Sequence, residues 1–174
     1  VDTLVARNQW GVRCVYSTLR MSGCLFEDNL INGVNARAGT VTITGNRIVA
    51  NRRGLYLQNS SGLVAGNDLS FNSEHGIFLE EGNEDVHDNR ITGNGRAGIR
   101  WLNAAGRLSR NTIAGNGEYA LINDGGGSVD ARSNWWGSDL PADIDAAVRD
   151  GRDLDGMGLV DAGKPLPQPV ALLL

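Results

Sequence analysis

Apolar residues recur at three positions in a unit of 21 to 23 residues that repeats along most of the chain. One apolar position comes two places after a recurring Asn, the second follows a recurring Gly, and the third lies three places before the next unit. The pattern predicts three short strands per unit, joined by Asn/Gly turns. The columns are Phe26, Ile48, Leu69, Ile91, Ile113 and Trp136; Val34, Leu55, Ile77, Ile99 and Leu121; and Met21, Ile43, Val64, Val86, Leu108 and Ala131.

Two columns of Asn accompany the apolar columns. Asn and Gly tolerate the positive φ of tight turns, and stacked Asn side chains can hydrogen-bond to one another and to the turn backbone. We therefore expect both columns to lie at turns as ladders of side-chain amides. The first holds Asn46, Asn67, Asn89, Asn111 and Asn134, with Cys24 in the same place one unit earlier; the second holds Asn29, Asn51, Asn72, Asn94 and Asn116.

The length of the repeat narrows the architecture to two classes. Repeats of about 20 to 30 residues are typical of leucine-rich horseshoes and of parallel β-helices. These units have few leucines and no room for a helix, so three short strands per turn favour a parallel β-helix. Six coils stacked at the strand spacing of about 4.8 Å would make a rod of roughly 29 Å. Repetition lets each coil bury its apolar residues against the next, because one coil alone has no core.

The repeat phrase N-x-I-x-x-N-x-x-x-G-I-x-L, from about Val5 to Gly137, carries a family resemblance. It resembles the right-handed parallel β-helix repeat of pectate-lyase-like enzymes, alginate epimerases and periplasmic copper-binding proteins of the nitrous oxide reductase maturation type. The segment SNWWGSDLPADIDAAVRDGRD is similar to the C-terminal end of many extracellular or cell-surface bacterial β-helix proteins. The resemblance implies an all-β, right-handed parallel β-helix of about six coils and an extracellular or cell-surface location, with the periplasm as the alternative. One scaffold hosts many activities, so the function stays open.

We expect the chain to have two parts, a parallel β-helix over residues 1–138 and a C-terminal cap helix with a tail over residues 139–174. Pro141 suits the first turn of the cap helix, and Gly151 is a suitable stop. Ile144, Ala147 and Val148 would share the face that covers the strands of the last coil.

The two ends of the rod differ in sequence. Trp136 falls in an inward column and would close the base of the rod, whereas Trp135 would point outward. At the other end Val1 enters the strand pattern almost directly, with nothing comparable to the cap. We therefore expect upstream residues or another chain to cover the N-terminal coil.

Composition and charge change the picture in three ways. The 174 residues are 41% hydrophobic and 21% charged, which suits one folded domain. With a net charge of −4 the chain lacks a basic footprint for nucleic acid, and no stretch of about 18 residues is apolar enough for a membrane span. Cys14 and Cys24 lack zinc-ligand spacing, so they are either buried thiols or one disulfide.

The strand after the recurring Gly has an outward side rich in candidate binding residues. Because the apolar residue after each Gly points inward, the next residue points out, as does the residue two places further. Exposed aromatic rings beside Arg and amide groups suit sugar rings and carboxylates. We therefore predict a glycan-binding face; the alternatives are a randomly decorated sheet or a face buried on a partner protein. The predicted binding residues are Arg13, Asn35, Arg37, Tyr56, Gln58, Phe78, Glu80 and Arg100.

Signals for metal binding are weaker. The segment DGRDLDG, residues 150 to 156, has the rhythm of a calcium loop, but Gly151 and Ala162 stand at the first and last ligand places. Copper would need His, Met or Cys, and the chain has two of each. We expect no cofactor, with calcium as the alternative. One coil holds acidic residues and histidines that would form a solvated acidic edge or a cation site, namely Glu74, His75, Glu80, Glu81, Glu84, Asp85, His87 and Asp88.

Catalytic signals are also weak, and no catalytic residue is assigned. EDVHD, residues 84 to 88, is similar to the Asp-Pro-His-Asp motif of alginate epimerases, but Val86 replaces the Pro and falls in an inward column, which favours a strand. A lyase or epimerase needs a proton acceptor and a charge neutraliser in one groove, for which Tyr56, Arg100 and Glu80 are the best set. The neighbouring column alternates in sign and predicts a surface salt ladder of Arg47, Asp68 and Arg90.

The sequence therefore favours a noncatalytic extracellular module that supplies a rigid spine and a lateral binding surface for glycan or a partner protein. One alternative is a polysaccharide lyase or epimerase that acts on an acidic polysaccharide. The other is a subunit of a larger cell-surface assembly or filament, with a partner stacked on the N-terminal coil.

Overall fold

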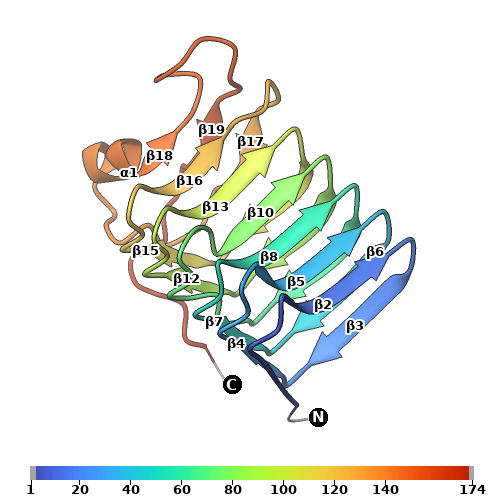
Figure 1. Ribbon diagram of the computed structural model, residues 1–174. Helices are drawn as coiled ribbons and strands as arrows, with labels where there is room; N and C mark the ends of the chain where they lie inside the picture. Colours follow the sequence, from blue (N-terminus) through green and yellow to red (C-terminus); the bar gives the residue numbers. More distant parts are fainter. Residues whose placement is uncertain (1–2, 173–174) are drawn as a thin grey trace.

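The computed structural model describes residues 3–172 and shows three strand columns wound into one parallel β-helix (Figure 1). Within each sheet, equivalent strands of successive coils pair in parallel, as β8 pairs with β10 and β10 with β13. The prediction of an all-β solenoid of about six coils with a short helix near the C-terminus is confirmed. Within the described residues, no helix is long and apolar enough to cross a membrane.

The coils build two long sheets and a more broken third side. The seven-stranded sheet comprises β2 (Trp10–Val15), β5 (Asn32–Arg37), β8 (Arg53–Gln58), β10 (Ile77–Glu80), β13 (Ala97–Leu102), β16 (Tyr119–Asn123) and β18 (Val148–Arg149). The five-stranded sheet comprises β3 (Thr18–Ser22), β6 (Thr40–Thr44), β9 (Ser61–Ala65), β11 (Asn83–His87) and β14 (Ala105–Ser109). On the third side lie β1 (Leu4–Ala6), β4 (Leu25–Glu27) and β7 (Arg47–Val49), then β12 (Arg90–Thr92) and β15 (Thr112–Ala114).

The core lies inside the coils, where the three predicted apolar columns meet. Leu55, Ile77 and Ile99 occupy equivalent places on three successive strands and are fully buried. Val64 and Val86 likewise occupy equivalent places on neighbouring strands of the five-stranded sheet and are fully buried. Each such side chain stabilises the fold by about 1.5–3 kcal/mol through burial alone, so the inward columns hold the coils in register.

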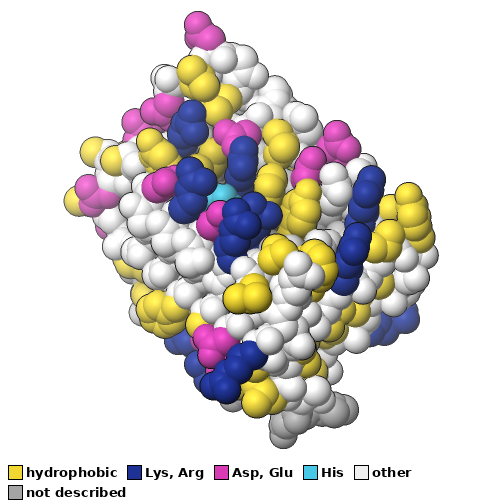
Figure 2. All heavy atoms as spheres, in the orientation of Figure 1, with side chains coloured by type: hydrophobic (Ala, Val, Ile, Leu, Met, Phe, Trp, Pro, Cys, Tyr) yellow, Lys and Arg dark blue, Asp and Glu magenta, His cyan; other side chains and the backbone are white. Residues whose placement is uncertain are grey.

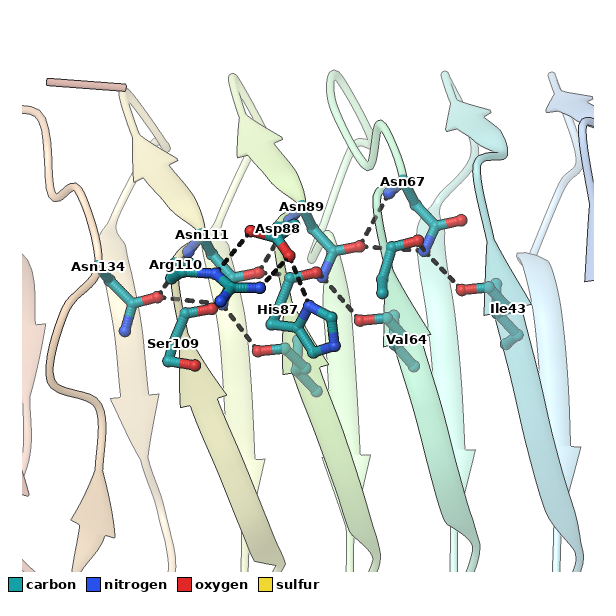
Figure 3. A network of polar contacts seen from close by, with 12 residues as sticks. Ile43, Val64, Asn67, His87, Asp88, Asn89, Ser109, Arg110, Asn111 and Asn134 are labelled. Carbon is teal, nitrogen blue, oxygen red and sulfur yellow. Dashed lines mark hydrogen bonds and ion pairs between the residues drawn. The ribbon is translucent and has the colours of Figure 1, made fainter. Parts of the chain in front are cut away.

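The Asn columns form two continuous ladders at the turns, as predicted, and Figure 3 shows the first of them. The backbone N–H and the Nδ2 group of Asn67 both donate to Asn89 Oδ1, at 2.9 and 3.0 Å. The same Nδ2 group donates to the Ile43 carbonyl at 2.8 Å. Asn72 and Asn94 repeat this geometry in the second ladder. Buried amides therefore find partners in neighbouring coils, which a buried polar group requires.

The residue before each ladder Asn adopts a left-handed backbone, which the sequence pattern did not reveal. Before the first ladder this place is held by Gly45 and Gly66 but also by Asp88, and before the second ladder by Ala50 and Phe71. The φ angle is 56° at Ala50 and 58° at Phe71. A non-Gly residue costs roughly 1–2 kcal/mol in this region, so the ladder bonds hold the turn in a strained conformation.

The C-terminal segment forms the expected helix α1 (Pro141–Ala147), which starts at Pro141 and buries Ile144. The prediction that the helix continues to Gly151 with Val148 on its apolar face is wrong. Val148 instead opens β18 and pairs with Leu121 on the edge of β16. A β-branched residue suits a strand, and the edge of β16 offers it backbone hydrogen bonds. Farther on, β19 (Val160–Asp161) pairs with β17 (Val129–Asp130), so the segment adds strands to the end of the rod.

The two tryptophans at the C-terminal end of the rod lie as the sequence predicts. Trp136 lies inside the last repeat and is buried, as predicted, while Trp135 is partly exposed. Val1 lies outside the described residues.

The alternative of a disulfide is not realised in the structure, where Cys14 and Cys24 are separate, partly buried thiols.

Candidate functional site

The outward columns of the seven-stranded sheet have the predicted register. Arg13, Asn35, Tyr56, Phe78 and Arg100 lie side by side on β2, β5, β8, β10 and β13. Two places further along the same strands, Arg37, Gln58 and Glu80 also lie side by side. The structure therefore brings the eight predicted binding residues onto one face of one sheet.

The centre of this face is an aromatic pair covered by arginines. The Tyr56 and Phe78 rings lie 5.1 Å apart with a tilt of 34°. The guanidinium of Arg100 lies 4.8 Å from the centre of the Phe78 ring, and that of Arg53 lies 5.7 Å from Tyr56 and 5.8 Å from Phe78. We call Arg53, Tyr56, Phe78 and Arg100 the aromatic–arginine cluster. Each cation–π contact is worth about 0.5–1 kcal/mol at an exposed site.

Phe78 departs from the expectation that both aromatic rings are exposed. It is only 8% exposed, because Tyr56 and Arg100 flank its ring and Arg53 lies over both rings. Tyr56 stays partly exposed. A ligand ring can therefore stack on Tyr56, while Phe78 supports the cluster from within.

Tyr56 is held in one protonation state and one orientation. Its hydroxyl donates to Glu80 Oε2 at 2.5 Å. Burial, followed by the hydrogen bond and the negative charge of Glu80, raises the pKa of Tyr56 to about 12. The phenol therefore stays protonated at physiological pH, and its oxygen is a poor proton acceptor for a lyase or epimerase reaction.

Ion pairs fix the arginines of the face. Arg53 and Arg52 both hold Glu74, each at 2.8 Å. Burial raises the pKa of Glu74, but the hydrogen bonds and charges of these two arginines outweigh that effect and lower it. Arg100 pairs with Asp124 at 2.6 Å. The cluster is therefore ordered without a ligand.

Arg53 was not predicted to lie on this face, and His75 was considered only as part of a cation site. Both residues stand three places before an outward residue of the first column, Tyr56 and Phe78. By the period-2 alternation of a strand this third place points to the opposite side, so we did not assign it to the face. Arg53 opens β8, where the chain turns and its side chain can reach over both rings, whereas His75 lies two residues before the start of β10.

The acidic residues and histidines of the coil from Glu74 to Asp88 do not converge on one point. Glu74 faces arginines, Glu80 faces Tyr56, and Asp88 pairs with Arg110 and His87. Across residues 3–172, no three His, Cys, Asp or Glu side chains form a group that could hold a metal ion. The cation site considered for this coil is therefore not formed.

Glu84 behaves unlike the rest of its coil. Its side chain is fully buried, and Ser60 Oγ donates to its Oε1 at 2.6 Å, whereas its Oε2 has no hydrogen-bond partner among residues 3–172. Gly62 and Gly106 hold the equivalent places on the neighbouring strands. Burial raises the pKa of Glu84 to about 7, although the hydrogen bond from Ser60 opposes the shift. The alternation that places Val86 inward also places Glu84, two residues earlier, on the inward side, and this signal in the sequence was not used.

The remaining motifs have structural roles. Val86 is fully buried in β11, so EDVHD is a strand as predicted. Asp68 bridges Arg90 and Arg47, which confirms the salt ladder. In the segment DGRDLDG, the carboxylate of Asp150 accepts hydrogen bonds from Arg152 and from the Val160 N–H.

Three parallel strand columns and two amide ladders define the protein as a parallel β-solenoid. Residues 6–135 match the family model described as "Right handed beta helix region", so the chain belongs to this family. This confirms the right-handed parallel β-helix repeat that the resemblance implied. Searches of curated proteins and of solved structures found no significant match.

Proposed function

We propose that the protein is a noncatalytic, extracellular or cell-surface β-helix module that binds glycan on the outward face of its seven-stranded sheet. The observation that carries the proposal is the partly exposed Tyr56 ring at the centre of the aromatic–arginine cluster. A sugar ring has an apolar face that can stack on an aromatic ring, and its hydroxyl groups can bond with surrounding polar groups. Gln58 and Glu80, beside Tyr56, supply such groups.

The preorganisation of the face supports binding rather than chemistry. Tyr56 is oriented by Glu80, and Arg53 is oriented by Glu74, so little side-chain freedom is lost when a ligand arrives. A lyase or epimerase would need a proton acceptor, and the pKa of Tyr56, raised to about 12, does not favour that role.

The test compares Tyr56→Ala with Leu63→Ala on a glycan array, followed by calorimetry. Leu63 is a matched control, since it is partly exposed on β9 in the other long sheet. Loss of one stacked ring, worth about 1 kcal/mol, should weaken binding about five-fold in Tyr56→Ala alone. Equal binding by both variants, with both folded, overturns the proposal. If a partner protein is captured instead, and Tyr56→Ala abolishes that capture, the face serves protein recognition.

A subunit role in a larger cell-surface assembly is a second candidate, favoured by the N-terminal coil. Strands β1, β2 and β3 are the terminal strands of their sheets among the described residues. A terminal strand that no other part of the protein covers can pair with another chain. Light scattering across a concentration series tests this role. If the particle mass grows with concentration, and Val12→Lys on β2 suppresses that growth, the protein assembles. A constant monomer mass would refute assembly.

A further inference from the structure

A small pocket borders the aromatic–arginine cluster. It has a volume of about 110 Å³ and is lined by His75, Arg96, Arg100, Glu118, Asp124 and Arg149, with Ile122 as its apolar part. Arg100 belongs to both sites, since its guanidinium lies over Phe78 and also lines the pocket. Figure 2 shows basic and acidic side chains gathered around a histidine on this face. Pockets for whole small molecules span about 300–1,000 Å³, so this one suits a single functional group.

His75 gives the pocket a hydrogen-bond donor on a ring that is largely buried. The side chain is only 3% exposed, and its Nδ1 accepts a hydrogen bond from the Ala97 backbone N–H at 3.3 Å. Because Nδ1 is an acceptor, the proton of the neutral ring is on Nε2. Burial, followed by the charge of Arg100, lowers the pKa of His75 to about 4, so the ring is neutral at physiological pH. Within residues 3–172, Nε2 has no hydrogen-bond partner.

The charged side chains that line the pocket carry an excess of one positive charge. Arg96 pairs with Glu118 at 3.1 Å, and Arg100 pairs with Asp124 at 2.6 Å. Arg149 reaches the same Asp124 only at 4.0 Å. Three guanidinium groups thus face two carboxylates, and Arg149 is the least engaged of the three. A ligand with one negative charge would balance the pocket, whereas a phosphate dianion would overcompensate it.

We propose that this pocket is a subsite for one monoanionic oxyanion of an acidic glycan, a carboxylate or a sulfate ester, bound by His75 Nε2–H and the Arg149 guanidinium. The inference rests on the proposed glycan-binding function and extends it, because a sugar that stacks on Tyr56 would place a neighbouring acidic residue along the sheet toward Arg100. Guanidinium groups bind carboxylates and related oxyanions through charge-assisted hydrogen bonds. The subsite would make the face selective for acidic over neutral glycans.

The experiment titrates the folded, isotope-labelled protein with glucuronate, with glucose 6-sulfate and with glucose as the neutral control, and follows the imidazole signals of His75 by NMR. Either anion should shift the Nε2 and Hε2 signals with a Kd in the millimolar range, while glucose should not. A shift with glucuronate alone identifies a carboxylate subsite, and a shift with glucose 6-sulfate alone identifies a sulfate subsite. Unchanged His75 signals with both anions overturn the proposal.

Variants separate the subsite from the rest of the face. Arg149→Gln should weaken binding of the anion about ten-fold, and His75→Gln, which keeps an N–H donor, should retain more binding than His75→Phe. Arg107→Gln, on β14 in the other long sheet, is the matched control and should have no effect. Equal binding by Arg149→Gln and Arg107→Gln refutes the subsite. If neutral glycan binding still depends on Tyr56 in that case, the proposed function stands without the subsite.

Discussion

The buried carboxyl of Glu84 makes a quantitative prediction about stability. Its pKa is raised from 4.5 to about 7 by burial. An acid with a higher pKa in the folded state favours folding in its protonated form. Its stabilising contribution is therefore complete below about pH 4.5 and is lost progressively as the pH rises to about 7. At about 1.4 kcal/mol per pKa unit, the loss amounts to about 3 kcal/mol.

Glu84→Gln should remove this loss, because the amide has nearly the same shape and cannot ionise. Its carbonyl oxygen can still accept the hydrogen bond that Ser60 donates to Glu84 Oε1. Between pH 4.5 and 7.5 the free energy of unfolding of the variant should change by about 3 kcal/mol less than that of the wild type. Since whole domains are stable by only about 5–15 kcal/mol, the difference is large.

Urea unfolding at a series of pH values, followed by circular dichroism, measures the effect. Asp85→Asn is the matched control, since Asp85 is the next residue of β11 and is exposed. This control should keep the pH dependence of the wild type. If Glu84→Gln and the wild type lose stability in parallel between pH 4.5 and 7.5, then the buried carboxyl does not titrate there and the reasoning is wrong.

Three further predictions concern the coil architecture. Ala50→Gly should raise the free energy of unfolding by about 1 kcal/mol, because Ala50 has a φ of 56°, which Gly adopts without strain. The control Ala105→Gly lies on β14, where the backbone is extended. It should lower the free energy of unfolding by a similar amount in the same denaturation assay. Asn89→Ala should destabilise the protein by about 3 kcal/mol, because it leaves the hydrogen-bond partners of Asn89 in the ladder unsatisfied. Asn35→Ala should change the free energy of unfolding by at most about 0.5 kcal/mol. Similar values for the two variants would contradict the ladder argument. Deleting residues 139–174 removes α1, β18 and β19 and should cause aggregation that light scattering detects, and a monomer with an unchanged Tm would show that the segment is not a cap.

The fold was predictable because each inward position recurs in several units of the repeat. Leu55, Ile77 and Ile99 mark the same column independently, so no single substitution hides the period. The end of α1 was not predictable in the same way. Val148 occurs once, and its strand conformation depends on the free edge of β16, which only the folded coil supplies.

For the candidate site, the sequence predicted which side of the sheet the residues lie on, but not how their side chains pack against one another. Alternation placed Tyr56 and Phe78 outward, which the strand register confirms. The burial of Phe78 depends on where the long side chains of Arg53 and Arg100 come to rest, and no periodicity encodes that. Glu84 is a related case. Alternation from Val86 predicts its inward position, but its carboxyl fits inside because glycines occupy the equivalent places in both adjacent coils, which only the register of three strands reveals.

The amide ladders also give the rod an electrical direction. Each ladder carbonyl, such as Asn89 Oδ1, accepts from the coil before it, so the partially negative side-chain oxygens of both columns point toward the N-terminal coil. Aligned dipoles in a hydrogen-bonded chain polarise one another and add, as peptide dipoles do in a helix. The N-terminal end of each column is therefore its negative pole, and a cationic group of a neighbouring molecule is favoured beside that end over an anionic one.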